Sequence, residues 1–390
     1  MTTVKHFHSA MVGAPVLSGT AGSLIAVLDA CLVTGFALKS AESLTVAGGI
    51  ATLTISTGHS FEPDTIALIA GATPAGLNGE KRVLTTSTNT ITFAATGIAD
   101  GAATGTITAK LAPAGFAKEF AGTNLAAYRA ISPESTRMFL RVDDTGTTNA
   151  RVVGYEDMSD VNTGVGPFPS APQLSGGGWW PKANAANATA RGWTLVADSK
   201  GFYLHLHTSS GTQGLSGCIW AFGDFASFKS GDAYACTLQC SPNDVATASS
   251  SNTSATEYCS SSSPVQGAYL PRSFTTLGGS VAATHAASEY MANGVSGVSA
   301  APAAPSYPNG PDNGLVLSPK LILEPSVCRR GRYRGFYVVP QNCHTAFTWR
   351  EKLDGQGDLL GRKLMVIKCG SSAGTSSQGV VFIDITGPWG

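Results

Sequence analysis

The chain has little charge, and the charges it has cancel. Lys and Arg account for 25 of the 390 residues and Asp and Glu for another 25, so the formal net charge is +0 and charged residues make up 13%. A charged content of about 25% is typical of soluble proteins. A neutral chain has no general source of counterion release or of attraction to anionic lipids. We therefore expect neither nucleic acid nor an anionic membrane as its main partner.

The sequence also lacks the hydrophobic runs that direct proteins to or through a membrane. The apolar run at residues 24–38 is too short to span a bilayer and contains Asp29. The segment from Lys5 to His8 is followed by neither an apolar core nor a small-residue cleavage site, so we predict no signal peptide. These absences predict a protein that is made in a reducing cytoplasm and has no membrane span.

Cysteine frameworks and catalytic fingerprints are absent as well. The eight cysteines include one close pair, Cys236 and Cys240, but no second pair at a matching spacing, so a zinc site is not expected and free thiols are the default. The sequence contains no G-x-S-x-G elbow, Walker loop, G-x-G-x-x-G fingerprint or H-E-x-x-H helix. We predict no catalytic residue, no cofactor and no metal.

Alternation of apolar and small polar residues is what the sequence does contain. Between residues 44 and 111, five short segments follow a period of two and are rich in β-branched residues, which predicts strands. These segments are residues 50–55, 65–69, 82–85, 90–93 and 104–108. Turn signals such as Asn78-Gly79 separate them. We predict an inserted β-module at 44–111; if it has its own core, removing residues 43–111 leaves a folded remainder.

The residues around this module are assigned to one larger domain. Residues 1–43 form an N-terminal segment in which 22–32 has apolar residues at helical spacing, with Ser23 available as the N-cap. Residues 112–390 form the main β-domain. Its expected strands are 137–142, 150–155, 193–197, 202–207, 218–222, 234–238, 321–323, 335–339, 363–368 and 380–385, and its expected long loops are 241–263 and 292–314. The predicted fold class is all-β, with a β-sandwich main domain and one short N-terminal helix.

One triplet is similar to a catalytic motif. Asp144-Thr145-Gly146 matches the core of an aspartic protease site, whose mechanism needs two carboxylates that share a proton. The chain has no second copy of the triplet. A hairpin turn between two strands, with Asp143 as its first residue, is the favoured interpretation.

Histidine and tryptophan pairs are candidates for binding. His205 and His207 are two residues apart on a predicted strand and so project from one face; they could bind zinc, but no third ligand can be assigned and a structural or interfacial role is favoured. Trp179 and Trp180 follow three glycines and could stack on a sugar. Packing into the core or a neighbouring subunit is the favoured interpretation of this pair.

The single basic cluster lies at residues 328–334 and includes Arg329 and Arg330. It could bind phosphate, but the strand-like residues 336–339 beside it favour an edge strand with solvated or interfacial arginines. The candidate ligand or partner surface is thus Trp179, Trp180, His205, His207, Arg329 and Arg330.

Four segments carry a resemblance to a known class of protein. They are the turn at 59–61, the strand at 65–69, the turn at 71–80 and the strand at 90–93. Together they resemble a small Ig-like β-domain that is frequent in virion proteins of tailed bacteriophages, although Glu62-Pro63-Asp64 replaces the Gly-Asp pair common before the strand. The segments 6–15, 143–146 and 382–389 look like those of uncharacterised phage structural proteins.

This resemblance implies a non-enzymatic structural component of a tailed-phage virion, in the tail, tail tip or baseplate. Such a protein would be assembled in the host bacterial cytoplasm and would act through repeated contacts with copies of itself and with other virion proteins. The low charge suits surfaces that are buried between subunits. The open alternatives are a protein that binds host-surface glycan, a head-decoration protein, and a polysaccharide depolymerase or protease built around Asp144 or another acid.

Overall fold

The structure is a computed structural model, and almost all of its regular structure is β-strand. It describes residues 3–212, 214, 217–242, 268–287, 306–325, 328–339, 341, 343–370 and 378–390. Within these residues the strands form three antiparallel sheets of thirteen, six and eight strands, with one short α-helix near the N-terminus. The predicted all-β class is therefore confirmed. None of the described helices is long and apolar enough to cross a membrane.

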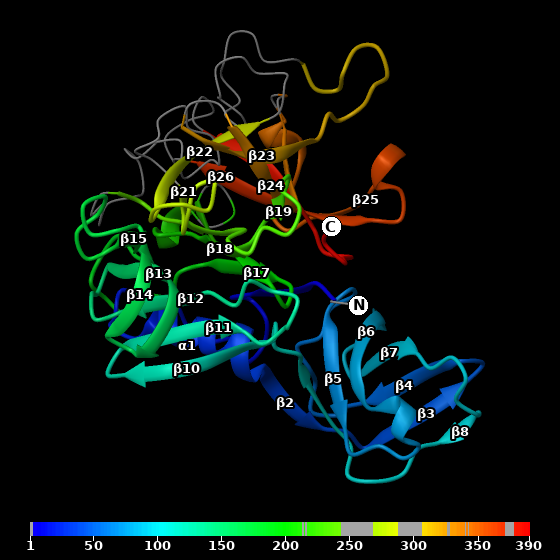
Figure 1. The fold of residues 1–390 in the computed structure, drawn as a ribbon. Coiled ribbons are helices and arrows are strands. Elements are labelled where there is room, and N and C mark those ends of the chain that lie inside the picture. The colour runs from blue at the N-terminus through cyan, green and yellow to red at the C-terminus, as the bar shows by residue number, and fades with distance from the viewer. Residues whose placement is uncertain are drawn as a thin grey trace.

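The sheet of thirteen strands, here called the main sheet, runs through the upper body of the molecule (Figure 1). Its order is β1 (Lys5–His8), β16 (Trp193–Ala197), β17 (Gly201–Leu206), β18 (Cys218–Asp224), β20 (Cys236–Gln239), β21 (Ala268–Leu270), β22 (Val281–Ala287), β23 (Ser318–Glu324), β24 (Cys328–Val338), β27 (Gln378–Asp384), β26 (Lys363–Gly370) and β25 (Lys352–Asp354), with β19 (Ala226–Ser227) beside β24. The loop expected at 241–263 lies outside the described residues except for its first two. The loop expected at 292–314 is described only from residue 306, and contains no strand there.

The sheet of six strands, here called the lateral sheet, packs on the main sheet to form the sandwich. It contains β10 (Phe116–Gly122), β11 (Leu125–Ala130), β12 (Phe139–Asp143), β13 (Asn149–Asp160), β14 (Thr163–Phe168) and β15 (Gly178–Pro181). Aromatic rings meet between the two layers. Phe116 lies edge-on to Phe202, with ring centroids 6.0 Å apart, and Phe168 stacks on Phe222 at 6.5 Å.

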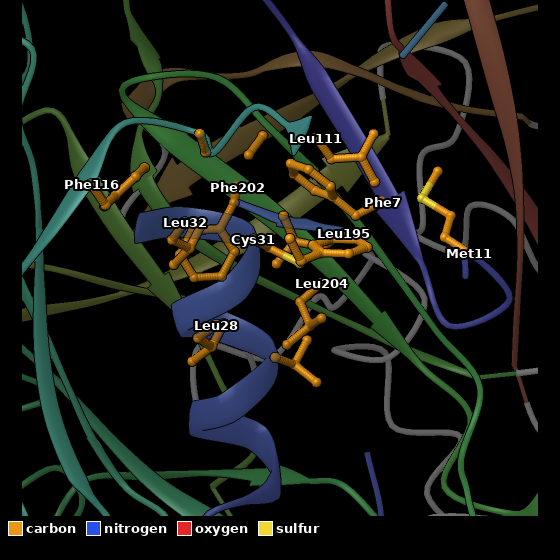
Figure 2. Close-up of a cluster of buried hydrophobic side chains, with 14 of the residues drawn as sticks. Phe7, Met11, Leu28, Cys31, Leu32, Leu111, Phe116, Leu195, Phe202 and Leu204 are labelled. Carbon is orange, nitrogen blue, oxygen red and sulfur yellow. The ribbon is translucent and has the colours of Figure 1, made fainter. Parts of the chain in front are cut away.

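Helix α1 (Ser23–Leu28) continues into a π-helical turn, Asp29–Thr34. Its side chains Leu28, Cys31 and Leu32 point into the cluster between the layers (Figure 2). The prediction that Ser23 caps the helix is wrong. Ser23 is the first helical residue, and its hydroxyl donates to the carbonyl oxygens of Ser18 and Thr20 at 2.8 and 3.0 Å.

The inserted module has its own sheet of eight strands and extends to the lower right in Figure 1. The order is β2 (Phe36–Ser40), β9 (Thr108–Leu111), β5 (Ile66–Ala70), β6 (Gly79–Thr86), β7 (Thr90–Ala94), β4 (Ile50–Thr54), β3 (Ser43–Ala47) and β8 (Gly101–Ala102). Strand β2 pairs with β9, so the sheet begins at Phe36 and not at residue 44. In β3 and β4 the buried and less buried residues alternate, as the period of two predicts.

The module and the main domain share buried apolar surface. Phe7 of β1 packs on Phe36 of β2 with ring centroids 5.8 Å apart. One continuous cluster contains Leu53 of the module together with Leu111 and Leu195, and Figure 2 shows the last two around the helix. Buried apolar side chains are therefore continuous between the module and the main domain.

Replacing Phe36 with Ala is expected to lower the free energy of unfolding by about 3–5 kcal/mol, because loss of the buried ring leaves a cavity between the module and the main domain. Leu38 on the same strand is the matched control: it is 65% exposed, so Leu38→Ala should change stability by less than about 0.5 kcal/mol. Urea unfolding followed by tryptophan fluorescence measures both. Equal costs for the two variants would contradict a shared core.

Candidate functional site

The two tryptophans of β15 do not form a free sugar platform. Trp180 is fully buried, and its indole N–H donates to the carbonyl oxygen of Gln239 at 2.7 Å. Trp179 is half-buried, and the guanidinium of Arg151 lies 3.8 Å from its ring centroid. One face of Trp179 is therefore covered. Arg151 is held there by the carbonyl oxygen of Gly177 at 2.7 Å.

The two histidines of the β17 region are core residues. His205 and His207 are 2% and 0% exposed, and their rings meet edge to face at 4.5 Å. The ring centroids of Trp349 and His207 lie 4.5 Å apart, and the guanidinium of Arg350 lies 3.6 Å from the Trp349 ring centroid. The pKa of His205 lies well below its usual value. Burial is the main cause, and the neighbouring His207 is the second. This arrangement fits the structural role favoured from the sequence.

The basic cluster lies on an inner strand, so the prediction of an edge strand is wrong. Strand β24 pairs with β23 on one side and with β27 and β19 on the other. Side chains alternate along it: Arg330 is fully buried and Arg329 is exposed. Arg330 forms ion pairs with Asp232 at 2.8 Å and Glu324 at 3.3 Å, so only Arg329 of this pair faces solvent.

The structure does not gather these predicted residues into one site. They lie on or next to three strands, β15, β17 and β24, and β15 belongs to a different sheet from the other two. Among the described residues no group of three or more His, Cys, Asp or Glu side chains could hold a metal ion. The described thiols of Cys31, Cys236, Cys240 and Cys343 are buried, and burial raises the pKa of Cys343 to about 12.

The segment around Asp144 connects β12 to β13, which confirms the turn interpretation. The Oδ1 atom of Asp143 accepts the backbone N–H of Thr145 at 3.2 Å. The Asp144 side chain does something that the sequence did not indicate. Its Oδ2 atom accepts the N–H groups of Leu24 and Ile25 at 2.8 and 3.2 Å, and so caps helix α1.

The other carboxylate oxygen of Asp144 pairs with Lys182, and both side chains are fully buried. The Lys182 ammonium also donates to the carbonyl oxygen of Thr20 at 2.7 Å. Burial raises the pKa of Asp144 and lowers that of Lys182, while each partner's charge opposes this effect. This buried pair ties the N-terminal segment to the lateral sheet.

A second polar region lies where the module meets the main domain. Lys5 pairs with Glu80 at 2.7 Å and His8 pairs with Glu62 at 2.8 Å. Between them His6 is 1% exposed, and neither ring nitrogen has a hydrogen-bond partner among the residues that the structure describes. Its pKa lies well below its usual value of 6.5 because of burial and then because of the positive charge of Lys352.

An apolar groove of about 630 Å³ lies at the far end of the main sheet. Its walls are Tyr307, Leu315, Leu317, Phe347, Leu353, Leu359, Leu364 and Phe382. Within this lining, Phe347 lies edge-on to Phe382, with ring centroids 5.4 Å apart. Two carboxylates, Asp354 and Asp358, also line the groove.

The loop after β25 shapes one wall of this groove. A Cβ atom on Gly355 would come within 2.1 Å of the Leu359 carbonyl oxygen, and Gly361 has a φ of +80°, so glycine is needed at both positions. The resulting tight loop turns Leu359 into the groove. The next side chain, Leu360, is 82% exposed. No sequence motif marked this site, because its parts are far apart in the chain.

The chain matches no model of a protein family, and no curated protein is similar to it.

Replacing Asp144 with Asn is expected to lower the free energy of unfolding by about 3–5 kcal/mol, because Lys182 would keep its charge in a buried place without a partner. Asp143→Asn, one residue away at a partly exposed position, is the control and should cost less than about 1 kcal/mol. Chemical denaturation measures both variants. A loss below 1 kcal/mol in Asp144→Asn would show that the pair does not anchor the fold.

Acidification should destabilise the protein through His6. Because its folded pKa lies below the usual 6.5, the unfolded chain binds more protons in this range, and stability falls as the pH drops below 6.5. The slope is at most about 1.4 kcal/mol per pH unit for each such histidine. His6→Gln should flatten the pH dependence of Tm between pH 7.5 and 5. An unchanged slope in His6→Gln would contradict this assignment.

Proposed function

We propose that the chain is a non-enzymatic structural component of a tailed-phage virion, in the tail, tail tip or baseplate. It acts through repeated contacts with copies of itself and with other virion proteins. It would be located in the virion after assembly in the host bacterial cytoplasm. The resemblance of the module and of the chain's opening and ending segments is the starting point of the proposal. One feature of the molecule carries it further.

That feature is the pairing of a projecting leucine with an apolar groove. Leu360 is the next residue after Leu359, which forms part of the groove wall, and is 82% exposed. An exposed apolar side chain of this size beside a concave apolar surface is typical of a protein–protein contact. Two copies related by a twofold axis could each insert Leu360 into the other's groove, since such an interface uses the same surface twice.

The distribution of charge supports the same proposal. Several of the few charged side chains form ion pairs inside the protein. Arg330 pairs with Asp232, and Arg334 donates two hydrogen bonds to Asp198, at 2.6 and 2.8 Å. Large apolar side chains are exposed elsewhere, including Val12 and Val165, each at 64%. A surface with little charge and exposed apolar side chains is better suited to burial between subunits than to a free monomer.

Replacing Leu360 with Asp should abolish self-association, because a carboxylate would have to enter the apolar groove of the second copy. Mass photometry and light scattering of the purified chain measure this. Leu277→Asp is the matched control: it introduces the same charge at an exposed leucine that is not part of the groove, and should assemble like the unaltered chain. A strictly monomeric unaltered chain, or a Leu360→Asp variant that still assembles, would contradict the proposed contact.

A further inference from the structure

The contact between Lys182 and Asp144 is enclosed on all sides by the protein. Both side chains are fully buried, and the Lys182 Nζ atom lies directly against Oδ1 of Asp144. The Lys118–Asp29 pair is different, because its side chains are 26% and 31% exposed. At Lys182 and Asp144 an amine and a carboxyl group are thus held together away from solvent.

The hydrogen bonds of Lys182 are too few for a buried ammonium group. An ammonium has three N–H donors. Among the described residues, Nζ of Lys182 has two acceptors, Oδ1 of Asp144 and the carbonyl oxygen of Thr20 at 2.7 Å. A third N–H group therefore has no acceptor among the residues that the structure describes, and a buried donor without a partner is unfavourable.

The same surroundings match an amide between the two side chains. Oδ2 of Asp144 accepts the backbone N–H groups of Leu24 and Ile25 at 2.8 and 3.2 Å, whereas Oδ1 has Lys182 as its partner. With Nζ bonded to Cγ in place of Oδ1, the one N–H left would donate to Thr20. The one oxygen left would keep its two backbone donors. Every polar atom of the amide would then have a partner.

Burial also favours the protonation states in which an amine reacts with an acid. It raises the pKa of Asp144 and lowers the pKa of Lys182, and the charge of the partner opposes each effect. Transfer of one proton from Nζ to Oδ1 converts the ammonium and the carboxylate into a neutral amine and a neutral carboxylic acid. A neutral lysine that is removed from water is a nucleophile.

We propose that Lys182 and Asp144 condense into an intramolecular isopeptide bond. The lone pair of Nζ forms a bond to Cγ of Asp144, and the bond between Cγ and Oδ1 breaks. Oδ1 leaves as water with the carboxyl proton and one proton from Nζ, so the step needs no oxidant and no other reactant. Contact between the two groups provides proximity. The N–H groups of Leu24 and Ile25 stabilise the negative charge that develops on Oδ2.

The bond joins two segments of the lateral sheet. Asp144 lies in the connection between β12 and β13, and Lys182 directly follows β15, which pairs with β13. The cross-link therefore fixes the edge at which β13 and β15 meet. It needs no oxidising environment, unlike a disulfide, and the described cysteines are free thiols. The inference does not depend on the proposed virion role.

Mass spectrometry of the full chain under denaturing conditions tests the proposal. We expect a mass lower than that of the sequence by one water molecule. Trypsin should not cut after Lys182, and the peptides that contain Asp144 and Lys182 should be joined in the digest. The Lys118–Asp29 pair, at 2.8 Å, is the control within the chain: its peptides should be separate, because solvent keeps that lysine protonated.

Two variants test the chemistry. Asp144→Asn and Lys182→Arg should both keep the full mass, because the amide of Asn cannot take the proton from the ammonium and a guanidinium remains charged. A link in Asp144→Asn with loss of ammonia would overturn the proton transfer proposed here. Thermal melting shows whether each variant is folded.

The unaltered chain decides the question even if neither variant folds. A full mass for the folded chain, or a loss of water that maps to other residues, would overturn the isopeptide bond. A link between Lys118 and Asp29 as well would overturn the requirement for burial. Self-association is measured separately through Leu360, so failure of one proposal is distinguishable from failure of the other.

Discussion

The buried carboxylate of Asp144 is the constraint on which the packing of the N-terminal half depends. It accepts two backbone N–H groups at the start of α1 and pairs with Lys182, so it joins the N-terminal segment, the β12–β13 connection and the residue after β15. A short helix has few internal hydrogen bonds and needs such external partners for its first turn. Once it is held there, its apolar side chains fill the space between the main and lateral sheets. The positions of the strands that pack around this helix therefore depend on the same Asp144 contacts.

Charge is scarce in this protein, and the fold uses much of it internally. Arg330 and Arg334 are buried against carboxylates, and the contact between module and main domain contains Lys5–Glu80 and His8–Glu62. Buried pairs of this kind specify which segments meet, since a wrong pairing would leave an uncompensated charge inside the protein. The surface that remains is low in charge. The groove proposed to receive Leu360 of a second copy follows from this scarcity of surface charge.

Local pattern was enough to predict most of the strands. The period of two located β4, β5 and β7 in the module, and the boundaries predicted for β16 agree with the structure, because alternation reports directly which face of a strand is buried. The local pattern was not enough to predict the positions of side chains whose partners are far away in the sequence. Trp180 and Arg330 are residue types that are common at recognition surfaces, but both are buried. Their partners come from distant segments: Gln239 from β20, and Asp232 from the connection between β19 and β20. The sequence did not predict the groove either, because the residues that line it come from segments far apart in the chain.

The sequence by itself determined the all-β class, the single short helix and the low surface charge, because each depends on local periodicity or on composition. Only the tertiary structure decided that the module's sheet begins at Phe36, that buried apolar side chains run without a break from the module into the main domain, and that Asp144 caps a helix. These features depend on which of many similar β-strands pair with one another. Strand pairing is a non-local choice in an all-β chain, and here it is resolved by buried charges and by shared apolar surface.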